Sequence, residues 1–156
     1  MNMKRRVFLK GALASGTVAL ALGAGIVTPR AVLAAWPKSA FEAKSVADAL
    51  GALYGAGDAA ASGDIEIKAP DIAENGAVVP VSVTAKMSGV ESISIFAEGN
   101  NSPLTSNWKL GAGAEPYVST RIKMAKTSNV IAVVQANGKT FQAAKEVKVT
   151  IGGCGG

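Results

Sequence analysis

VIAVVQANGKTFQAAKEVKVTI, residues 130–151, is the stretch from which the architecture follows most directly. It begins with an apolar run from Val130 to Gln135, which is typical of a central strand. Asn137-Gly138 is the strongest hairpin signal in the chain, because a tight two-residue turn needs positive φ at both positions. After the turn the apolar alternation is interrupted by Lys145, which predicts a bulge or a sheet edge there. The second strand is expected to bury one face, made of Phe141, Ala143, Val147, Val149 and Ile151.

Apolar and polar residues also alternate in four earlier segments, residues 64–68, 79–85, 92–97 and 118–124. Each is predicted to be a strand with one buried face. Between the last two of these segments, residues 99–113 are expected to be irregular, with one short strand near Trp108. This spacing predicts a mainly β protein, an immunoglobulin-like antiparallel β-sandwich, with a small barrel as the alternative. The single cysteine excludes an internal disulfide.

One helix is expected ahead of the strands, from about Ala40 to Tyr54. Ser39 is its predicted N-cap, with Glu42 three residues later at the spacing of a capping box. The apolar side of this helix is expected to pack on the domain or on a partner. That side consists of Phe41, Val46, Leu50, Leu53 and Tyr54.

Residues 1–34 have the pattern of a twin-arginine (Tat) signal peptide. Arg5-Arg6 stands in a basic segment, a glycine-interrupted apolar stretch runs from Gly11 to Val27, and Ala31-Val32-Leu33-Ala34 offers a cleavage site before Ala35. Export to the periplasm is therefore predicted, with an uncleaved anchor as the alternative. The sequence then divides into the signal at 1–34, a helix and sandwich domain at 35–151, and a flexible tail at 152–156.

Removal of the signal changes the charge of the protein. The chain holds 16 basic and 11 acidic residues, and five of the basic ones lie in residues 1–34, which contain no acid. The remainder has 11 of each sign and no net charge. The basic excess of the full chain therefore gives no reason to expect a nucleic acid or a membrane surface as partner.

Missing residue types exclude most cofactor chemistry. The chain has no histidine, which removes Cys-His catalysis and the usual haem, blue-copper and zinc sites. No cofactor and no metal are therefore expected. Asp64 and Glu66 alternate along a strand and are interpreted as a solvated face rather than a catalytic pair. Arg121 is a candidate for binding an anion, with a surface or interface cation as the more ordinary interpretation.

The remaining candidate for chemistry is Cys154, which stands near the carboxyl end between Gly152-Gly153 and Gly155-Gly156. Glycine adopts φ of either sign and has no side chain to pack, so the tail is expected to form a mobile arm rather than a fixed active site. A free thiol with a pKa near 8.5 is only about 3% ionised at neutral pH, so activation is expected to come from a receiving pocket. The predicted role is a non-catalytic carrier; the alternative is a structural exported domain that uses Cys154 for an intermolecular disulfide.

The ending VKVTIGGCGG at 147–156, the segment PYVSTRI at 116–122 and the twin-arginine leader together resemble the SoxY family. Its members are sulfur-carrier subunits of the periplasmic thiosulfate-oxidising (Sox) multienzyme system. The resemblance implies a sandwich domain preceded by a helical segment. It also implies a complex with SoxZ, as a heterodimer or heterotetramer, which explains a folded-export route without a cofactor.

By the same resemblance, Cys154 is the residue that carries sulfur oxyanions. The SoxAX cytochrome joins thiosulfate to it as an S-thiosulfonate, the manganese hydrolase SoxB releases sulfate, and a sulfur dehydrogenase oxidises the sulfur left behind. Gly152, Gly153, Gly155 and Gly156 are expected to keep the arm thin enough for narrow channels.

Overall fold

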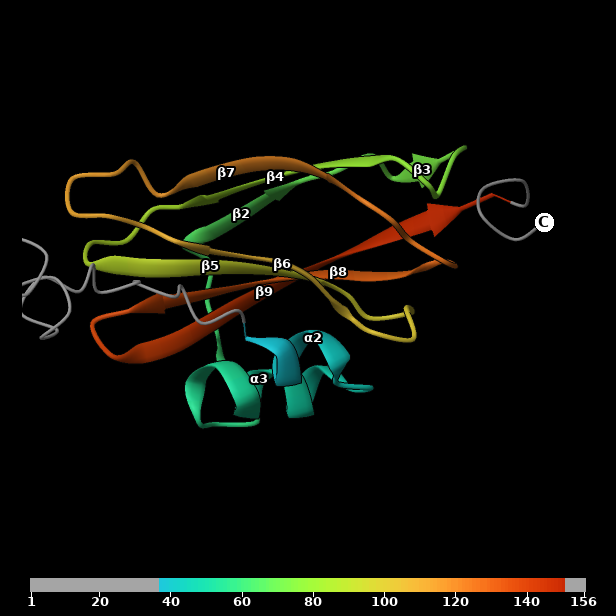
Figure 1. The fold of residues 1–156 in the computed structure, drawn as a ribbon. Coiled ribbons are helices and arrows are strands. Elements are labelled where there is room, and N and C mark those ends of the chain that lie inside the picture. The colour runs from blue at the N-terminus through green and yellow to red at the C-terminus, as the bar shows by residue number, and fades with distance from the viewer. Residues whose placement is uncertain (1–36, 151–156) are drawn as a thin grey trace, which may run out of the picture. The chain divides into compact units, whose positions relative to one another are not determined.

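The computed structural model describes residues 37–150, which form two short helices and two β-sheets (Figure 1). The helices are α2 (Lys38–Glu42) and α3 (Val46–Tyr54). The strands are β1 (Ala60–Ala61), β2 (Ile65–Lys68), β3 (Ile72–Ala73), β4 (Val79–Ala85), β5 (Val90–Ala97), β6 (Leu104–Lys109), β7 (Tyr117–Ile122), β8 (Ser128–Ala136) and β9 (Lys139–Val149). The predicted mainly β sandwich with helical structure at its start is confirmed. Within residues 37–150 no helix is long and apolar enough to cross a membrane.

The larger sheet has the strand order β1-β9-β8-β5-β6, and β3 also pairs with β9. Its centre is the predicted hairpin, in which β8 and β9 pair antiparallel from Ala136↔Lys139 to Ser128↔Val147. Asn137 and Gly138 form the turn with φ of 50° and 72°, the left-handed values that a two-residue turn of this hand requires. The central position predicted for the apolar run from Val130 is therefore correct.

The smaller sheet is antiparallel, in the order β2-β4-β7, and it packs face to face on the larger one. Burial alternates along β4, which is the expected pattern for a strand with one face in the core. The core between the sheets is almost entirely aliphatic. Its fully buried members include Val79, Val81, Val83, Ile93, Ile95, Met124, Val130, Val134 and Val147.

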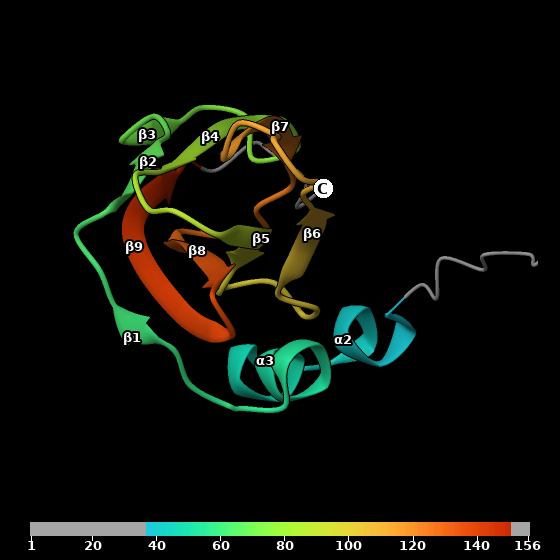
Figure 2. The ribbon, with the colours of Figure 1, turned by 90° about the vertical axis from the view of Figure 1, so that its left-hand side faces the viewer.

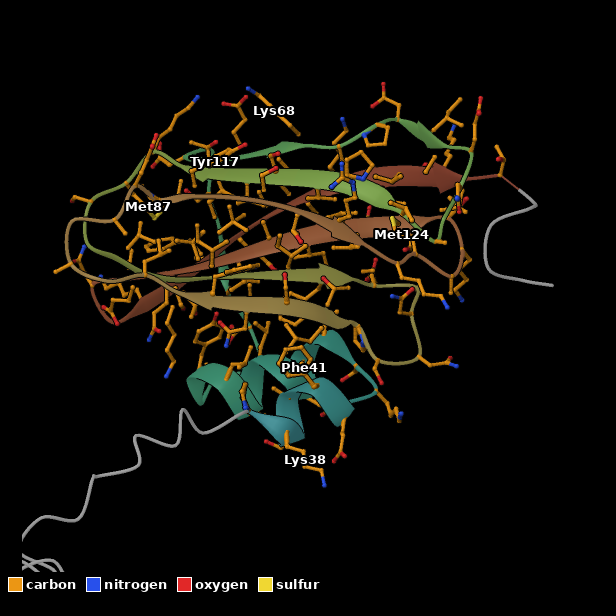
Figure 3. The ribbon with its side chains drawn as sticks, turned by 45° about the horizontal axis from the view of Figure 1, so that its top comes forward. Lys38, Phe41, Lys68, Met87, Tyr117 and Met124 are labelled. Carbon is orange, nitrogen blue, oxygen red and sulfur yellow. The ribbon has the colours of Figure 1, made fainter. Side chains whose placement is uncertain are left out.

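A second apolar cluster lies between the helices and the outer face of the larger sheet (Figure 2). Ala49 and Leu50 of α3 pack there against Phe96, Ile131 and Val133. Figure 3 shows Phe41 on the side of α2 that faces the sheet and Lys38 on the opposite side. The expected packing of the helical apolar side on the domain is confirmed, and it explains why β5 and β8 are buried on both faces.

Ser92 and Ser94 show how polar side chains are accommodated on that covered face. They are 4% and 0% exposed, on the side of β5 opposite Ile93 and Ile95. The Tyr54 hydroxyl is 2.6 Å from Ser94 Oγ and 3.3 Å from Ser92 Oγ, which satisfies the buried hydroxyls.

The single helix predicted from Ala40 to Tyr54 is wrong, because the structure breaks it at residues 43–45. Ala43 is extended at φ −57° and ψ 145°, and no side chain caps the start of α2, so the predicted Ser39 cap is also wrong. Ser45 caps α3 instead, with its Oγ accepting a hydrogen bond of 3.1 Å from the Asp48 amide. The serine side chain replaces a backbone carbonyl as acceptor and so starts a new helix.

The irregular segment expected at 99–113 contains more structure than predicted. The short strand near Trp108 exists, but as the six-residue β6, paired antiparallel with β5. Alternation did not mark it because its inner residues are mostly polar, among them Ser106 and Asn107.

Lys145 lies at an open edge of β9. Pairing with β8 runs past it without a shift of register, so the bulge interpretation is wrong. Within residues 37–150, the other edge of β9 pairs only with β1 at Phe141–Gln142 and with β3 at Lys148–Val149. In the gap between them, Lys145 Nζ donates to the Ala69 carbonyl at 2.6 Å and lies 3.0 Å from Asp71 Oδ1. The edge interpretation is therefore correct.

Candidate functional site

The predicted site residues Cys154, Gly152, Gly153, Gly155 and Gly156 lie outside the described residues. What the structure describes is the end of β9, from which this tail continues. Figure 1 shows that the end of β9, strand β3 and the connection from β7 to β8 lie at one end of the sandwich. The structure therefore describes the point at which the tail is attached, namely the end of β9 and the segments that contact it.

Hydrogen bonds hold the last residues of β9 on both sides. On the β3 side, the Lys148 amide donates to the Asp71 carbonyl at 3.0 Å and the Thr150 amide donates to the Ala73 carbonyl at 3.1 Å. On the other side, the Val149 amide donates to Thr127 Oγ1 at 2.9 Å. Hydrogen bonds thus hold the backbone as far as Thr150, the last residue that the structure describes.

Gly76 lies against Met124 and against Val149, the last residue of β9. Its carbonyl accepts a hydrogen bond of 2.7 Å from the Met124 amide. A Cβ added at Gly76 would collide with the Met124 carbonyl oxygen and lie 2.8 Å from Val149 Cγ1. The Asn75-Gly76 pair signals a turn in the sequence, but nothing local indicates that this turn presses on β9. Neither Thr127 nor Gly76 was identified from the sequence as part of the site.

The acidic residues near Asp64 have the environment expected of a solvated face. Glu66 lies 3.1 Å from Lys86 Nζ and 3.6 Å from Lys68 Nζ, with its side chain 41% exposed. The hydrogen bond and charge of Lys86 hold the pKa of Glu66 below its ordinary value, and Lys68 adds to this. A general acid needs the opposite shift, so Glu66 is suited to surface pairing. Among residues 37–150, no three metal-ligating side chains gather.

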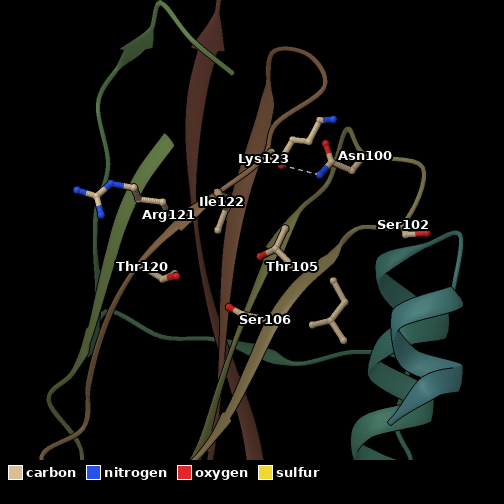
Figure 4. A pocket seen from close by; sticks show the side chains of 9 residues that line it. Asn100, Ser102, Thr105, Ser106, Thr120, Arg121, Ile122 and Lys123 are labelled. Carbon is tan, nitrogen blue, oxygen red and sulfur yellow. Dashed lines mark hydrogen bonds between the residues drawn. The ribbon is translucent and has the colours of Figure 1, made fainter. Parts of the chain in front are cut away.

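Arg121, the candidate anion-binding residue, lies on β7 opposite Pro80 with its side chain exposed. It borders a hollow of about 270 Å³ between β6 and β7 (Figure 4). Nine residues line this hollow: Asn100, Ser102, Leu104, Thr105, Ser106, Thr120, Arg121, Ile122 and Lys123. Among the lining residues, the sequence pointed only to Arg121 as a candidate for binding. The others gave no local signal, because they come together only when the two sheets pack.

Comparison with known proteins places the chain in a family. The family model for sulfur oxidation protein SoxY matches residues 50–154. The solved structure of the sulfur carrier protein SoxY from Chlorobium limicola f thiosulfatophilum is 47% identical over 67% of this chain and 94% of that chain, with a TM-score of 0.59. No curated protein sequence matches.

A superoxide reductase (neelaredoxin) from Ignicoccus hospitalis is also similar, at 20% identity over 55% of this chain and 79% of that chain, with a TM-score of 0.50. That likeness shows the fold alone. The family model, in contrast, covers well over half of the chain, including the last part of α3, both sheets and the sequence as far as Cys154. The chain belongs to the SoxY family of sulfur oxidation proteins, whose member from Chlorobium is a sulfur carrier.

Proposed function

We propose that this chain is a non-catalytic sulfur carrier that holds intermediates of thiosulfate oxidation covalently on Cys154. The observation that carries the proposal is the family match, which extends through the only cysteine of the sequence. A thiol is the side chain that can form and release bonds to sulfur reversibly. The hydrogen bonds of the Val149 and Thr150 amides are consistent with the proposal, because they hold the chain at a defined point just before the proposed arm.

The proposed loading step joins the Cys154 sulfur to the sulfane sulfur of thiosulfate. The thiol loses its proton, a sulfur–sulfur bond forms, and two electrons leave to a haem protein of the SoxAX type, which is the oxidant. The product is an S-thiosulfonate with one negative charge. No base within the chain is assigned to the thiol, so the enzyme that receives the tail has to stabilise the thiolate.

In the proposed unloading step, water attacks the terminal sulfone sulfur. The bond between the two outer sulfur atoms breaks, sulfate and two protons leave, and a persulfide anion stays on Cys154. A manganese hydrolase of the SoxB type supplies the metal for this hydrolysis, so the carrier needs none. A sulfur dehydrogenase and a second hydrolysis would then clear the remaining sulfur.

The rest of the chain is assigned by the same proposal. Residues 1–34 direct twin-arginine export to the periplasm, residues 35–151 form the carrier domain, and residues 152–156 form the arm. Gly152, Gly153, Gly155 and Gly156 add no side-chain width, so the arm can enter a narrow channel. The expected stable partner is SoxZ, as a heterodimer or heterotetramer.

Intact mass spectrometry tests the proposal on mature protein isolated from cells that are using thiosulfate. We expect adducts of sulfane, sulfonate or thiosulfonate composition, mapped to Cys154 and removed by reductant where a disulfide-type bond is present. A bare thiol during turnover, or only a disulfide between two chains, contradicts the carrier role and favours a structural domain linked through Cys154.

Two variants separate chemistry from access. Cys154→Ser is expected to abolish thiosulfate turnover with the fold intact. Gly153→Val is expected to leave the thiol reactive toward a small reagent but to reduce turnover by partner enzymes. Gly63→Ala is the control for a glycine replaced in the domain itself, because no described residue lies within 4 Å of an added Cβ there. Full turnover by Cys154→Ser would refute the assignment.

A further inference from the structure

The ladder between β8 and β9 stops before β9 ends. Its last pair is Ser128↔Val147, whereas β9 continues to Val149. The Lys148 and Thr150 amides donate to carbonyls on the β3 side. Successive residues of a strand direct their backbone groups to opposite edges, so the amide and carbonyl of Val149 are directed to the β8 side. β8 supplies no residue to pair with them there.

The side chain of Thr127 takes the place of the missing partner. Its Oγ1 accepts a hydrogen bond of 2.9 Å from the Val149 amide and donates one of 3.4 Å to the Val149 carbonyl. A threonine hydroxyl is both donor and acceptor, so one side chain can serve both backbone groups. Thr127 stands immediately before β8 in the chain. The hydroxyl therefore extends the ladder along β9 where the backbone of β8 has ended.

The bonds on the β3 side attach this end of β9 less firmly. β3 consists of Ile72 and Ala73, and within residues 37–150 it pairs only with β9. Ile72 is 59% exposed, so β3 buries little surface of its own. A segment with few buried contacts opens readily. Apart from the packing of Gly76 on Val149, Thr127 is thus the link, among the described residues, that holds the end of β9 toward β8.

This link determines how much chain lies between the last firm attachment and the cysteine. From Thr150, the four following residues up to Cys154 span about 13 Å when extended, at roughly 3.3 Å per residue. If the attachment ended at Val147, seven residues would follow and span about 23 Å. The effective concentration of a tethered group falls as about the −3/2 power of tether length, which is about twofold for this change.

We propose that Thr127 is a positioning residue of the carrier. Its hydroxyl fixes the point at which the proposed arm begins, and so sets how far from the domain Cys154 is presented. The inference rests on the proposed carrier function and extends it. A receiving enzyme meets the domain at its surface and the sulfur at its reacting group, so the reach of the arm has to match the distance between the two.

Three variants isolate the hydroxyl. Thr127→Val keeps the shape of the side chain and removes both hydrogen bonds, and Thr127→Ser restores the hydroxyl. Thr140→Val is the matched control, because Thr140 Oγ1 also donates to a backbone carbonyl, that of Asp58 at 3.4 Å. Thr140 lies at the hairpin end of the same strand, away from the end of β9. A general loosening of the domain would affect all valine variants alike.

The first measurement is the distance distribution between two nitroxide labels, read by pulsed electron paramagnetic resonance in the mature chain. One label is on Cys154 and the other on Lys139→Cys, an exposed position at the hairpin. We expect a wider distribution in Thr127→Val, and the starting width in Thr127→Ser and Thr140→Val. Amide exchange at Val149 is expected to accelerate roughly two- to tenfold in Thr127→Val, the factor for one net hydrogen bond.

Turnover of the loaded carrier by a hydrolase of the SoxB type gives the second measurement. Thr127→Val is expected to lower kcat about twofold and leave the KM for the carrier unchanged, because the domain docks as before while the arm enters less often. Thr127→Ser is expected to recover the rate. A role in stability alone would give the same loss in Thr140→Val.

Three results would overturn the proposal. The first is an unchanged distance distribution in Thr127→Val, which would show that β3 and Gly76 suffice to hold the end of β9. The second is equal widening in Thr140→Val. The third is a Thr127→Ser variant that behaves like Thr127→Val, which would assign the effect to the methyl group. Adducts on Cys154 in cells would support the carrier role in each of these cases, so the two proposals fail separately.

Discussion

Gly76 is a residue at which a single methyl group should be costly. An added Cβ meets backbone at Met124 and the Val149 side chain, and backbone cannot move aside as a side-chain end can. Gly76→Ala is therefore expected to lower the free energy of unfolding by about 1–3 kcal/mol, the usual cost of overpacking. Urea unfolding followed by tryptophan fluorescence measures it.

The control for Gly76→Ala is Gly63→Ala, where an added Cβ would have no atom of residues 37–150 within 4 Å. This change restricts the unfolded chain and is expected to be neutral or to stabilise by about 0.4–1 kcal/mol. Equal unfolding midpoints for the two variants would mean that the turn at Asn75-Gly76 yields easily and does not press on β9.

Glu66 gives a pH-dependent contribution whose sign follows from its partners. Lys86 first, and then Lys68, hold the pKa of the folded Glu66 below its ordinary value. A lowered carboxyl pKa stabilises the fold above the unfolded pKa of about 4.3, and this contribution is lost as pH falls through the folded pKa. Glu66→Gln should therefore lower the urea midpoint slightly at pH 7 and have a decreasing effect below about pH 4.3.

Lys86→Gln provides the second arm of that experiment, because it removes the partner with the largest effect on the Glu66 pKa. It is expected to show a similar small loss at pH 7 that also declines in acid. Both ion pairs are exposed and should weaken further in high salt. A loss of stability that persists undiminished at low pH would show that packing, not charge, is responsible.

At the scale of elements, the helical segment depends on one serine. Ser45 Oγ accepts from the Asp48 amide, whereas Ser39 lies inside α2, whose start has no capping side chain. Ser45→Ala is expected to cost about 0.5–2 kcal/mol of unfolding free energy. Ser39→Ala, at the position that the sequence pattern favoured, is expected to be nearly neutral.

Urea unfolding of both serine variants, with helix content followed by far-ultraviolet circular dichroism, makes this comparison. Because α3 buries Leu50 against β5 and β8, a weakened cap should be felt in global stability as well as in the helix. An equal cost for the two serines would contradict the capping geometry.

Local sequence patterns predicted an element correctly where the residues themselves favour a particular backbone conformation. Asn137-Gly138 fixed the hairpin because its positive φ values are a property of those two residues. The helix was misplaced because Ser39 and Ser45 are equally good caps in isolation, and only packing on the sheet selects between them. Strand β6 was shortened for a similar reason, since Ser106 and Asn107 are polar yet largely enclosed by the fold.

At the scale of the whole molecule, stability should be distributed unevenly. β5 and β8 are covered by the small sheet on one side and by the helices on the other. β1 and β3 are two-residue strands paired only with β9. Native-state hydrogen exchange is expected to be slowest for amides of β5 and β8, which open only on global unfolding, and fastest for β1 and β3.

Amide exchange measured by NMR gives this ranking directly. Slow exchange in β1 equal to that in β8 would contradict the layered arrangement. As for the site, the assignment of the reactive atom to Cys154 stays a prediction, because that residue lies outside residues 37–150. Cys154 is recognisable from the residues beside it, whereas Thr127, Gly76 and the hollow near Lys123 exist only because distant segments meet.

The pairing of β9 also determines how the domain would respond to mechanical force. Its ladder with β8 extends from Lys139 to Val147, and its last residues are held by Asp71, Ala73 and Thr127. A load applied along β9 through Cys154 would stress these bonds together in shear, since ladder bonds lie across the strand. The proposed carrier arm would therefore be attached at a junction that resists unfolding when a partner protein pulls on it.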